Sequence, residues 1–132
     1  MKFATFLRLA PLPLRLILGI IFISHGIMKF TALASTVHSF GHIGIPLPTI
    51  AVPIIALIEL IGGIALILGL GSRMFALLLA LDMLVAILTV KLAMGLVGGY
   101  EFELSLIAGL LTLILSGPGT LAIIRDRDSL LA

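Results

Sequence analysis

Long apolar stretches alternate with short segments rich in polar residues, glycine or proline along this chain. The apolar stretches cover residues 12–28, 49–70, 74–94 and 102–116. A helix of about 20 apolar residues crosses the hydrocarbon core of a bilayer, so the pattern predicts four transmembrane helices, the last of them short. Prolines precede the first two stretches and Gly117-Pro118-Gly119 ends the fourth, as expected at helix boundaries. The predicted fold class is all-α, a four-helix transmembrane bundle.

The segment that connects the first two stretches is amphipathic. Between Thr31 and Phe40, Leu33 and Val37 fall on the same side as Phe40, and serine, threonine and histidine occupy the other sides. This pattern predicts a short helix that lies in the membrane interface. Residues 71–73 leave room only for a tight turn between antiparallel helices, and residues 95–99 form a flexible, glycine-rich turn.

Composition places the chain in a membrane. Hydrophobic residues make up 61% of its 132 residues and charged residues only 11%, whereas soluble domains carry about 25% charged residues. Four spans consume most of this length, which predicts a single transmembrane domain over residues 1–132. The net charge of +2 comes without a basic run, which argues against nucleic acid as a partner, and the absence of cysteine excludes thiolate sites.

The basic residues are distributed unevenly about the predicted spans. If the N-terminus is cytoplasmic, most of them fall on or near that side, namely Lys2, Arg8, Arg15, Arg73, Arg125 and Arg127. Lys29 and Lys91 fall on the other side. The positive-inside rule therefore predicts that both termini are cytoplasmic. A signal peptide is the alternative for the N-terminus, but the first stretch continues without a small-residue cleavage site.

Two carboxylates interrupt the apolar stretches. Glu59 lies in the middle of the second stretch and Asp82 inside the third. A central acidic residue costs about 2.5–3.5 kcal/mol on insertion, and each central Leu or Ile returns about 0.3–0.6 kcal/mol, so both stretches can absorb a carboxylate. Glu59 stays ionised if Arg15 or Lys29 reaches it, and is neutral otherwise. In either state the carboxylates have two possible roles: they take part in the function of the protein, or they only hold the helices together.

Helical geometry predicts which side chains point inward. On the first helix, one face holds Arg15, Gly19, Phe22, Gly26 and Lys29, with His25 beside it. Glycines let a neighbouring backbone approach closely, so we expect this face to point into the bundle. Gly62 and Gly63 define a similar packing face next to Glu59 on the second helix.

The same geometry orders the polar residues of the last two helices. Asp82 shares a face with Ala86 and Thr89, while Lys91 projects in the opposite direction. On the fourth helix a face of small and polar residues is predicted to point inward, namely Glu101, Ser105, Ala108, Thr112 and Ser116. Glu103 is predicted to point the other way.

These faces together predict a polar pocket that opens away from the cytoplasm, with Glu59 near its floor. Its candidate pocket or ion-pair residues are Arg15, His25, Lys29, Glu59, Asp82 and Glu101. His25 has an alternative interpretation as a histidine that is simply satisfied by hydrogen bonds. The three histidines, His25, His38 and His42, lack the compact spacing of a metal site, and no metal is predicted.

Three segments together resemble the DoxX family of small four-helix membrane proteins. They are Arg15 to Lys29, Gly44-Ile-Pro46 followed by Glu59-Leu-Ile-Gly62-Gly63, and Tyr100-Glu101 with the closing Gly117-Pro118-Gly119. The resemblance covers about residues 15–119, and its Glu-x-x-Gly-Gly segment is the most specific part. The residues that carry over are Arg15, His25, Gly26, Lys29, Glu59, Gly62, Gly63 and Glu101. Asp82 matches no family position, and Lys91 stands where many members have histidine.

The resemblance implies a prokaryotic cytoplasmic membrane and quinone-linked redox or sulfur chemistry. We therefore expect a membrane subunit of such a system, with a quinone or small sulfur anion in the pocket, no covalently bound cofactor, and a soluble redox partner protein. A homo-oligomer is compatible with this expectation. Two alternatives stay open: a non-catalytic membrane anchor or assembly factor for a partner enzyme, and a small-solute transporter. Whether the chain is itself an enzyme is left undecided.

Overall fold

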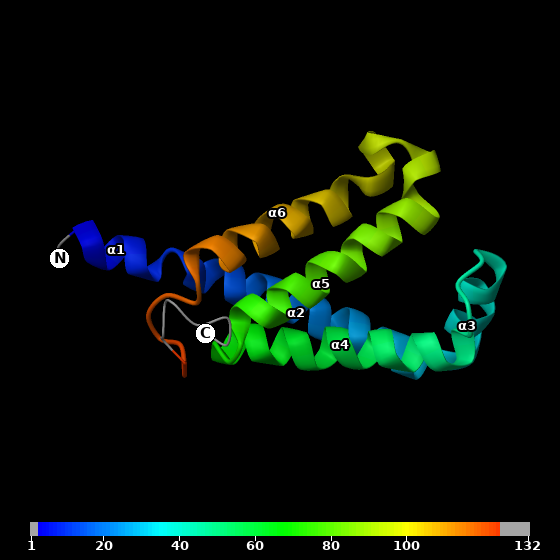
Figure 1. Cartoon of the computed structure of the whole chain (residues 1–132), viewed down its shortest axis with the longest axis horizontal. Helices are drawn as coiled ribbons and strands as arrows, with labels where there is room; N and C mark the ends of the chain where they lie inside the picture. Colours follow the sequence, from blue (N-terminus) through cyan, green and yellow to red (C-terminus); the bar gives the residue numbers. More distant parts are fainter. Residues whose placement is uncertain (1–2, 125–132) are drawn as a thin grey trace.

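A computed structural model describes residues 3–124 of the chain. Lys2, Arg125 and Arg127, which entered the predicted orientation, lie outside the described residues. The helices are α1 (Phe3–Leu9), α2 (Pro11–Thr31), α3 (Leu33–His42), α4 (Pro48–Leu68), α5 (Ser72–Ala86) and α6 (Glu101–Ser116), shown in Figure 1. Three short turns join α5 to α6: the wide π turn η1 (Ile87–Lys91), the 3-10 turn η2 (Leu92–Met94) and η3 (Leu96–Tyr100).

Four helical segments are long and apolar enough to cross a membrane. They are Phe3–Thr31, Pro48–Leu68, Ser72–Met94 and Leu96–Ser116. They confirm the predicted all-α fold with four spans, and their outward side chains are large and apolar, as contact with lipid requires. The amphipathic α3 follows α2 as expected. The short α1, which exposes Phe3, Phe6 and Leu7, was not predicted.

The bundle consists of two antiparallel helix pairs. α2 packs along α4 and α5 packs along α6, while α4 also contacts α5 and α2 contacts α6. Figure 1 shows the α5–α6 pair inclined to the α2–α4 pair, with its turn diverging from α3. The apolar core between the pairs is formed by Leu18, Phe22, Leu66, Ala76, Leu79, Ala80, Met83, Leu106, Leu110 and Leu113.

Glycines set the close approach of α2 to α4. A Cβ atom on Gly19 would lie 2.7 Å from the carbonyl oxygen of Gly63, and a Cβ atom on Gly26 would lie 2.9 Å from that of Ala56. Both distances are shorter than van der Waals contact with backbone atoms that cannot move aside. The predicted packing role of these glycines is consistent with this geometry, because lipid supplies no hydrophobic driving force and close packing must hold the helices together.

We expect Gly63→Ala to destabilise the bundle by about 2 kcal/mol, because overpacking of this size outweighs the gain in helix propensity. The added Cβ would meet the Gly19 oxygen at 2.7 Å and the Ile23 nitrogen at 2.9 Å. Gly62→Ala is the matched control, since its Cβ would meet only side-chain atoms of Leu79, the nearest at 3.1 Å. Thermal unfolding in detergent measures both, and equal melting temperatures would contradict the proposed backbone contact.

Candidate functional site

A cavity of about 190 Å³ lies in the half of the bundle that carries α3 and the α5–α6 turn. Six of its wall residues are ionisable, and they include five of the nine Asp, Glu, Lys and Arg residues that lie within residues 3–124. The cavity is lined by His25, Lys29, Phe40, Ile55, Glu59, Asp82, Met83, Ala86, Val90, Lys91, Phe102 and Glu103. The concentration of charge makes this cavity the candidate site.

An ion pair between α2 and α4 forms the floor of the cavity. The Lys29 Nζ atom donates a hydrogen bond to Glu59 Oε2 at 2.7 Å. The Glu59 side chain is 1% exposed and that of Lys29 is 18% exposed. Glu59 lies about 16 Å along α4 from Pro48, at a rise of about 1.5 Å per residue, which places it near the middle of the span. Of the two cations that the sequence offered to Glu59, the structure selects Lys29.

Asp82 brings a second carboxyl group to the same place from α5. Its carboxyl group lies close enough to that of Glu59 for the two to interact electrostatically, and it is also within electrostatic reach of Lys29. Two carboxyl groups in one buried site repel each other when both are ionised, which favours a state in which one of them carries a proton. The Oδ2 atom of Asp82 is buried and has no hydrogen-bond partner among residues 3–124. The pair is therefore suited to hold a single proton, and it presents one unpartnered polar atom at the cavity wall.

A second ion pair lies closer to the α5–α6 turn. The Lys91 Nζ atom is 3.8 Å from Glu103 Oε1, with side-chain exposures of 34% and 11%. Glu103 Oε2 is buried and, like Asp82 Oδ2, has no hydrogen-bond partner in the described part of the chain. The cavity thus contains two cations, three carboxyl groups and a histidine, and with one proton on the Glu59–Asp82 pair its charges balance.

Two predictions about these residues were wrong. The predicted inward face of α6 points outward, since Glu101, Ser105, Ala108, Thr112 and Ser116 are all exposed, and Glu103 faces the cavity in place of Glu101. Glu101 instead accepts a hydrogen bond from the Gly98 backbone N–H at 3.0 Å. Lys91 was expected to point away from Asp82, yet it lines the same cavity, because the wide π turn η1 breaks the regular rotation of α5.

The error in α6 has a physical cause. Ser105 and Thr112 donate hydrogen bonds to carbonyl oxygens one turn earlier in their own helix, so their hydroxyl groups need no partner from the bundle. Lipid is as apolar as the core, and polarity therefore does not distinguish the two sides of a membrane helix. The available signal was the spacing of Glu103 with Leu106, Leu110 and Leu113, which are all buried.

His25, one of the candidate residues, lines the cavity. Its ring stacks on Phe102 with centroids 6.1 Å apart and an angle of 20° between the planes. The contact joins α2 to α6 across the cavity. Because one nitrogen of a neutral imidazole donates a hydrogen bond and the other accepts one, His25 can bind a ligand group of either kind.

Arg15 was a candidate pocket or ion-pair residue, and the structure places it outside the charged cavity. Its side chain is fully buried at the opposite end of α2, away from the cavity. Nε donates to Leu66 O at 2.8 Å and Nη2 to Ile67 O at 2.8 Å, both in the last turn of α4. The remaining bonds, at 3.0 to 3.4 Å, reach the carbonyl oxygens of Pro118, Thr120 and Leu121. Arg15 thus ties residues 118–121 to the end of α4 that attracts cations.

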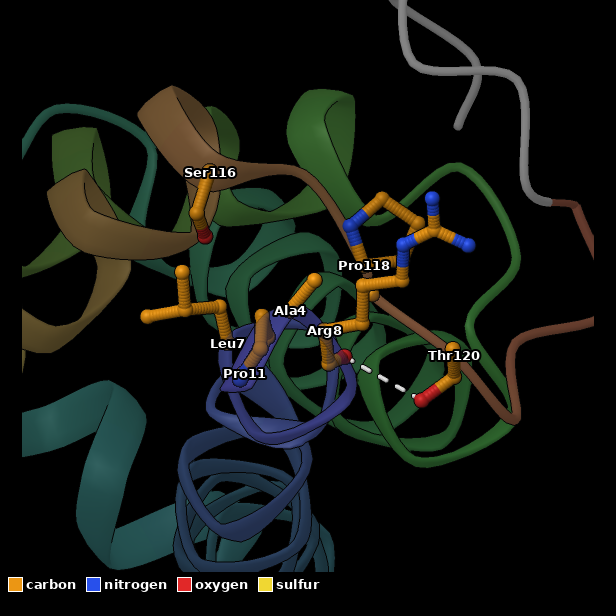
Figure 2. A pocket seen from close by; sticks show the side chains of 8 residues that line it. Ala4, Leu7, Arg8, Pro11, Ser116, Pro118 and Thr120 are labelled. Atoms are coloured by element: carbon orange, nitrogen blue, oxygen red, sulfur yellow. Dashed lines mark hydrogen bonds between the residues drawn. The ribbon is translucent and has the colours of Figure 1, made fainter. Parts of the chain in front are cut away.

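A larger cavity of about 610 Å³ lies at the end of the bundle that carries α1, and it is shown in Figure 2. It is lined by Ala4, Leu7, Arg8, Pro11, Ser116, Pro118, Gly119 and Thr120. Figure 2 shows the Thr120 hydroxyl group bonded to the backbone oxygen of Arg8, at 3.1 Å, and the Arg8 guanidinium group turned away from that bond. With one ionisable side chain and no acid–base pair, this cavity offers much less chemistry than the smaller one.

No group of three histidine, aspartate or glutamate side chains is arranged to hold a metal ion within residues 3–124. The chain also lacks cysteine. The candidate site therefore offers ion pairs and a carboxyl pair, whose chemistry is the binding of polar groups and the transfer of protons.

Comparison with known proteins shows the family to which the chain belongs. The DoxX family model matches residues 10–92, a range that contains Lys29, Glu59, Asp82 and Lys91 and excludes Glu103. The chain is 42% identical over 116 residues to a Bacillus subtilis (strain 168) protein named "Putative oxidoreductase CatD", covering 88% of this chain and 85% of that one. It is 33% identical over 120 residues to "Uncharacterized membrane protein Rv3486" of Mycobacterium tuberculosis (strain ATCC 25618 / H37Rv), covering 80% and 74%. No solved structure matches the chain. The chain belongs to the DoxX family of membrane proteins.

Proposed function

We propose that this protein is the membrane subunit of a quinone-linked redox system, and that the quinone head group binds in the charged cavity. The observation that carries the proposal is the group formed by Lys29, Glu59 and Asp82 in the middle of the membrane. Charged residues at this depth are costly and commonly form proton relays. The name of the Bacillus subtilis relative, an oxidoreductase, agrees with this class of reaction.

Quinone reduction consumes two electrons and two protons, and the side chains of this cavity are suited to supply protons. The Glu59–Asp82 pair is suited to hold and release one proton and lies next to the Lys29 ammonium group, which stabilises whichever carboxylate is left behind. Asp82 Oδ2 and Glu103 Oε2 are buried acceptors without partners, so they suit a ligand that carries hydroxyl groups, as a quinol does. Electrons would come from a soluble electron-transfer protein, because a chain without cysteine has no thiol redox centre of its own.

The proposed orientation places both termini in the cytoplasm of a prokaryotic cell and the cavity nearer the outer face. It rests on the distribution of basic residues across the chain. Lys29 and Lys91, the two cations of the cavity, are the ones that depart from this distribution. Their departure is explained if each is retained for its carboxylate partner in the cavity.

We expect Glu59→Gln to lower protein-dependent quinone reduction at least tenfold in vesicles prepared from expressing cells, supplied with a short-chain quinone and with soluble extract of the same cells as the source of the electron-transfer protein. The variant keeps the size of the side chain and removes its charge and its ability to take up a proton. Glu101→Gln is the matched control, since Glu101 is exposed outside the cavity, and its rate should equal that of the wild type. Equilibrium displacement of a radiolabelled short-chain quinone from purified protein separates weaker binding from slower turnover.

Three outcomes would contradict the proposal. If Glu59→Gln retains the wild-type rate, Glu59 has no part in proton transfer. If the variant loses thermal stability while the rate per folded molecule is unchanged and quinone binds to neither protein, the chain is a membrane anchor or assembly factor whose ion pairs only hold the helices. A small-solute transporter would instead show uptake into proteoliposomes that Glu59→Gln abolishes.

A further inference from the structure

Two histidines on the exposed side of α3 lie outside the charged cavity and have no part in the proposed redox function. His38 and His42 are one helical turn apart, and both are exposed. Their Nε2 atoms are 3.0 Å apart, and their ring centroids are 4.4 Å apart at an interplanar angle of 80°. The two rings therefore turn the same nitrogen atom toward a common point.

This separation matches the bite of a divalent transition-metal ion. Imidazole nitrogens bind Zn²⁺ at about 2.0–2.1 Å, so two nitrogens at right angles about such an ion are separated by about 2.9 Å, and two at a tetrahedral angle by about 3.4 Å. Without a metal, the contact is a hydrogen bond in which one Nε2–H donates to the other, unprotonated Nε2. Both rings can be neutral at once in this arrangement, which is the state that binds metals.

We propose that His38 and His42 form a two-imidazole binding site for Cu²⁺, Zn²⁺ or Ni²⁺ on the surface of the interfacial helix. The three histidines as a set are too far apart in sequence for a compact site, but His38 and His42 alone are four residues apart. Helical histidines at this spacing are a common pair of ligands, because they project from the same face. The two nitrogens come from the protein and water supplies the other ligands, since within residues 3–124 no third His, Asp or Glu side chain is placed to join them. Cu²⁺ binds most tightly, in accordance with the general order of affinities.

The site also has a structural consequence for its helix. A metal bound to both rings links residues one turn apart and so stabilises α3, a short ten-residue helix without a buried side chain. α3 also carries Phe40, which lies between the two histidines in sequence and lines the charged cavity. The metal would thus bind on one side of α3, while Phe40, on a different side of the same helix, lines the cavity.

The proposal is tested by titrating Cu²⁺ into purified protein in detergent after removal of any histidine tag. We expect one equivalent to bind, with an electron paramagnetic resonance spectrum that shows coupling to imidazole nitrogens. His38→Gln and His42→Gln should each weaken binding at least tenfold, and the double variant should abolish it. His25→Gln is the control, because His25 lies in the cavity and should leave the affinity unchanged.

Size-exclusion profiles and helix content, measured on each variant, will check that the exposed substitutions leave the protein folded. Binding that persists unchanged in His38→Gln or in the double variant would overturn the proposal and assign the metal to other groups. Loss of binding in His25→Gln alone would likewise overturn it. A failure of the proposed quinone chemistry leaves this result unaffected, since neither histidine touches the cavity.

Discussion

Replacement of Arg15 by glutamine is expected to lower the melting temperature of the purified protein by about 10 °C or more, which corresponds to a loss of about 3 kcal/mol. The guanidinium group is fully buried and donates to five backbone carbonyl oxygens, including two in the last turn of α4. Glutamine is shorter and has two donors, so at least three of these acceptors would lose their bond in a buried environment.

The control for this experiment is Arg8→Gln. Arg8 lies seven residues earlier on the same side of the bundle, and its side chain is exposed. We expect its melting temperature to stay within about 2 °C of the wild type, because exposed charges contribute little to stability. Equal effects of the two substitutions would show that Arg15 acts through its charge alone and not through its bonds.

The hydrogen bonds of Arg15 also predict which segment detaches from the bundle when Arg15 is replaced. Residues 118–121 are held by Arg15, and the neighbouring Ala122 is buried. Because the chain has no cysteine, Ala122→Cys gives a single reactive thiol. Its labelling by a maleimide should be slow in the wild-type background and fast when Arg15 is replaced. Ile123→Cys, at an exposed position, should label quickly in both.

Replacement of Lys29 by methionine is expected to cost about 3 kcal/mol, because it leaves the Glu59 carboxylate buried without its cation. Lys29 Nζ and Glu59 Oε2 are 2.7 Å apart, and Glu59 is 1% exposed. The double variant with Glu59→Gln should recover most of the loss, since no unpaired charge remains. Chemical or thermal unfolding in detergent of the wild type, both single variants and the double variant gives the interaction energy directly.

Lys91→Met provides the comparison within the same cavity. Its ammonium group is 3.8 Å from Glu103 and the Lys91 side chain is 34% exposed, so its loss should cost less than about 1 kcal/mol. If Lys29→Met is no more damaging than Lys91→Met, the Lys29–Glu59 pair does not stabilise the bundle. If the double variant is as unstable as Lys29→Met, Lys29 contributes packing instead of charge.

The sequence predicted four features of the fold correctly: the membrane class, the four spans, the interfacial helix and the tight α4–α5 turn. These features depend on local properties: runs of apolar residues long enough to cross a bilayer, and prolines and glycines at their ends. Gly69 and Gly71, for example, adopt the positive φ angles of 71° and 54° that the turn after α4 needs. The Lys29–Glu59 pair was among the predicted alternatives, because both residues share faces with packing glycines.

Other parts of the site depended on contacts that no local pattern reports. Arg15 finds its acceptors in residues more than 50 positions away, so its neighbours in sequence gave no sign of them. Lys91 reaches the cavity only because a π turn interrupts α5, and Glu103 replaces Glu101 because α6 turns its apolar face inward.

The sequence by itself determined that this protein is a bundle of membrane helices, and that Glu59 lies at mid-depth among packing glycines. Only the tertiary structure decided which charges meet. The reason is that a span is defined by hydrophobicity along one helix, whereas the inward face of a helix surrounded by lipid is defined by its neighbours. Tertiary packing therefore paired Lys29 with Glu59 and brought Asp82 beside them. It also bonded Arg15 to backbone carbonyl groups at the opposite end of the bundle.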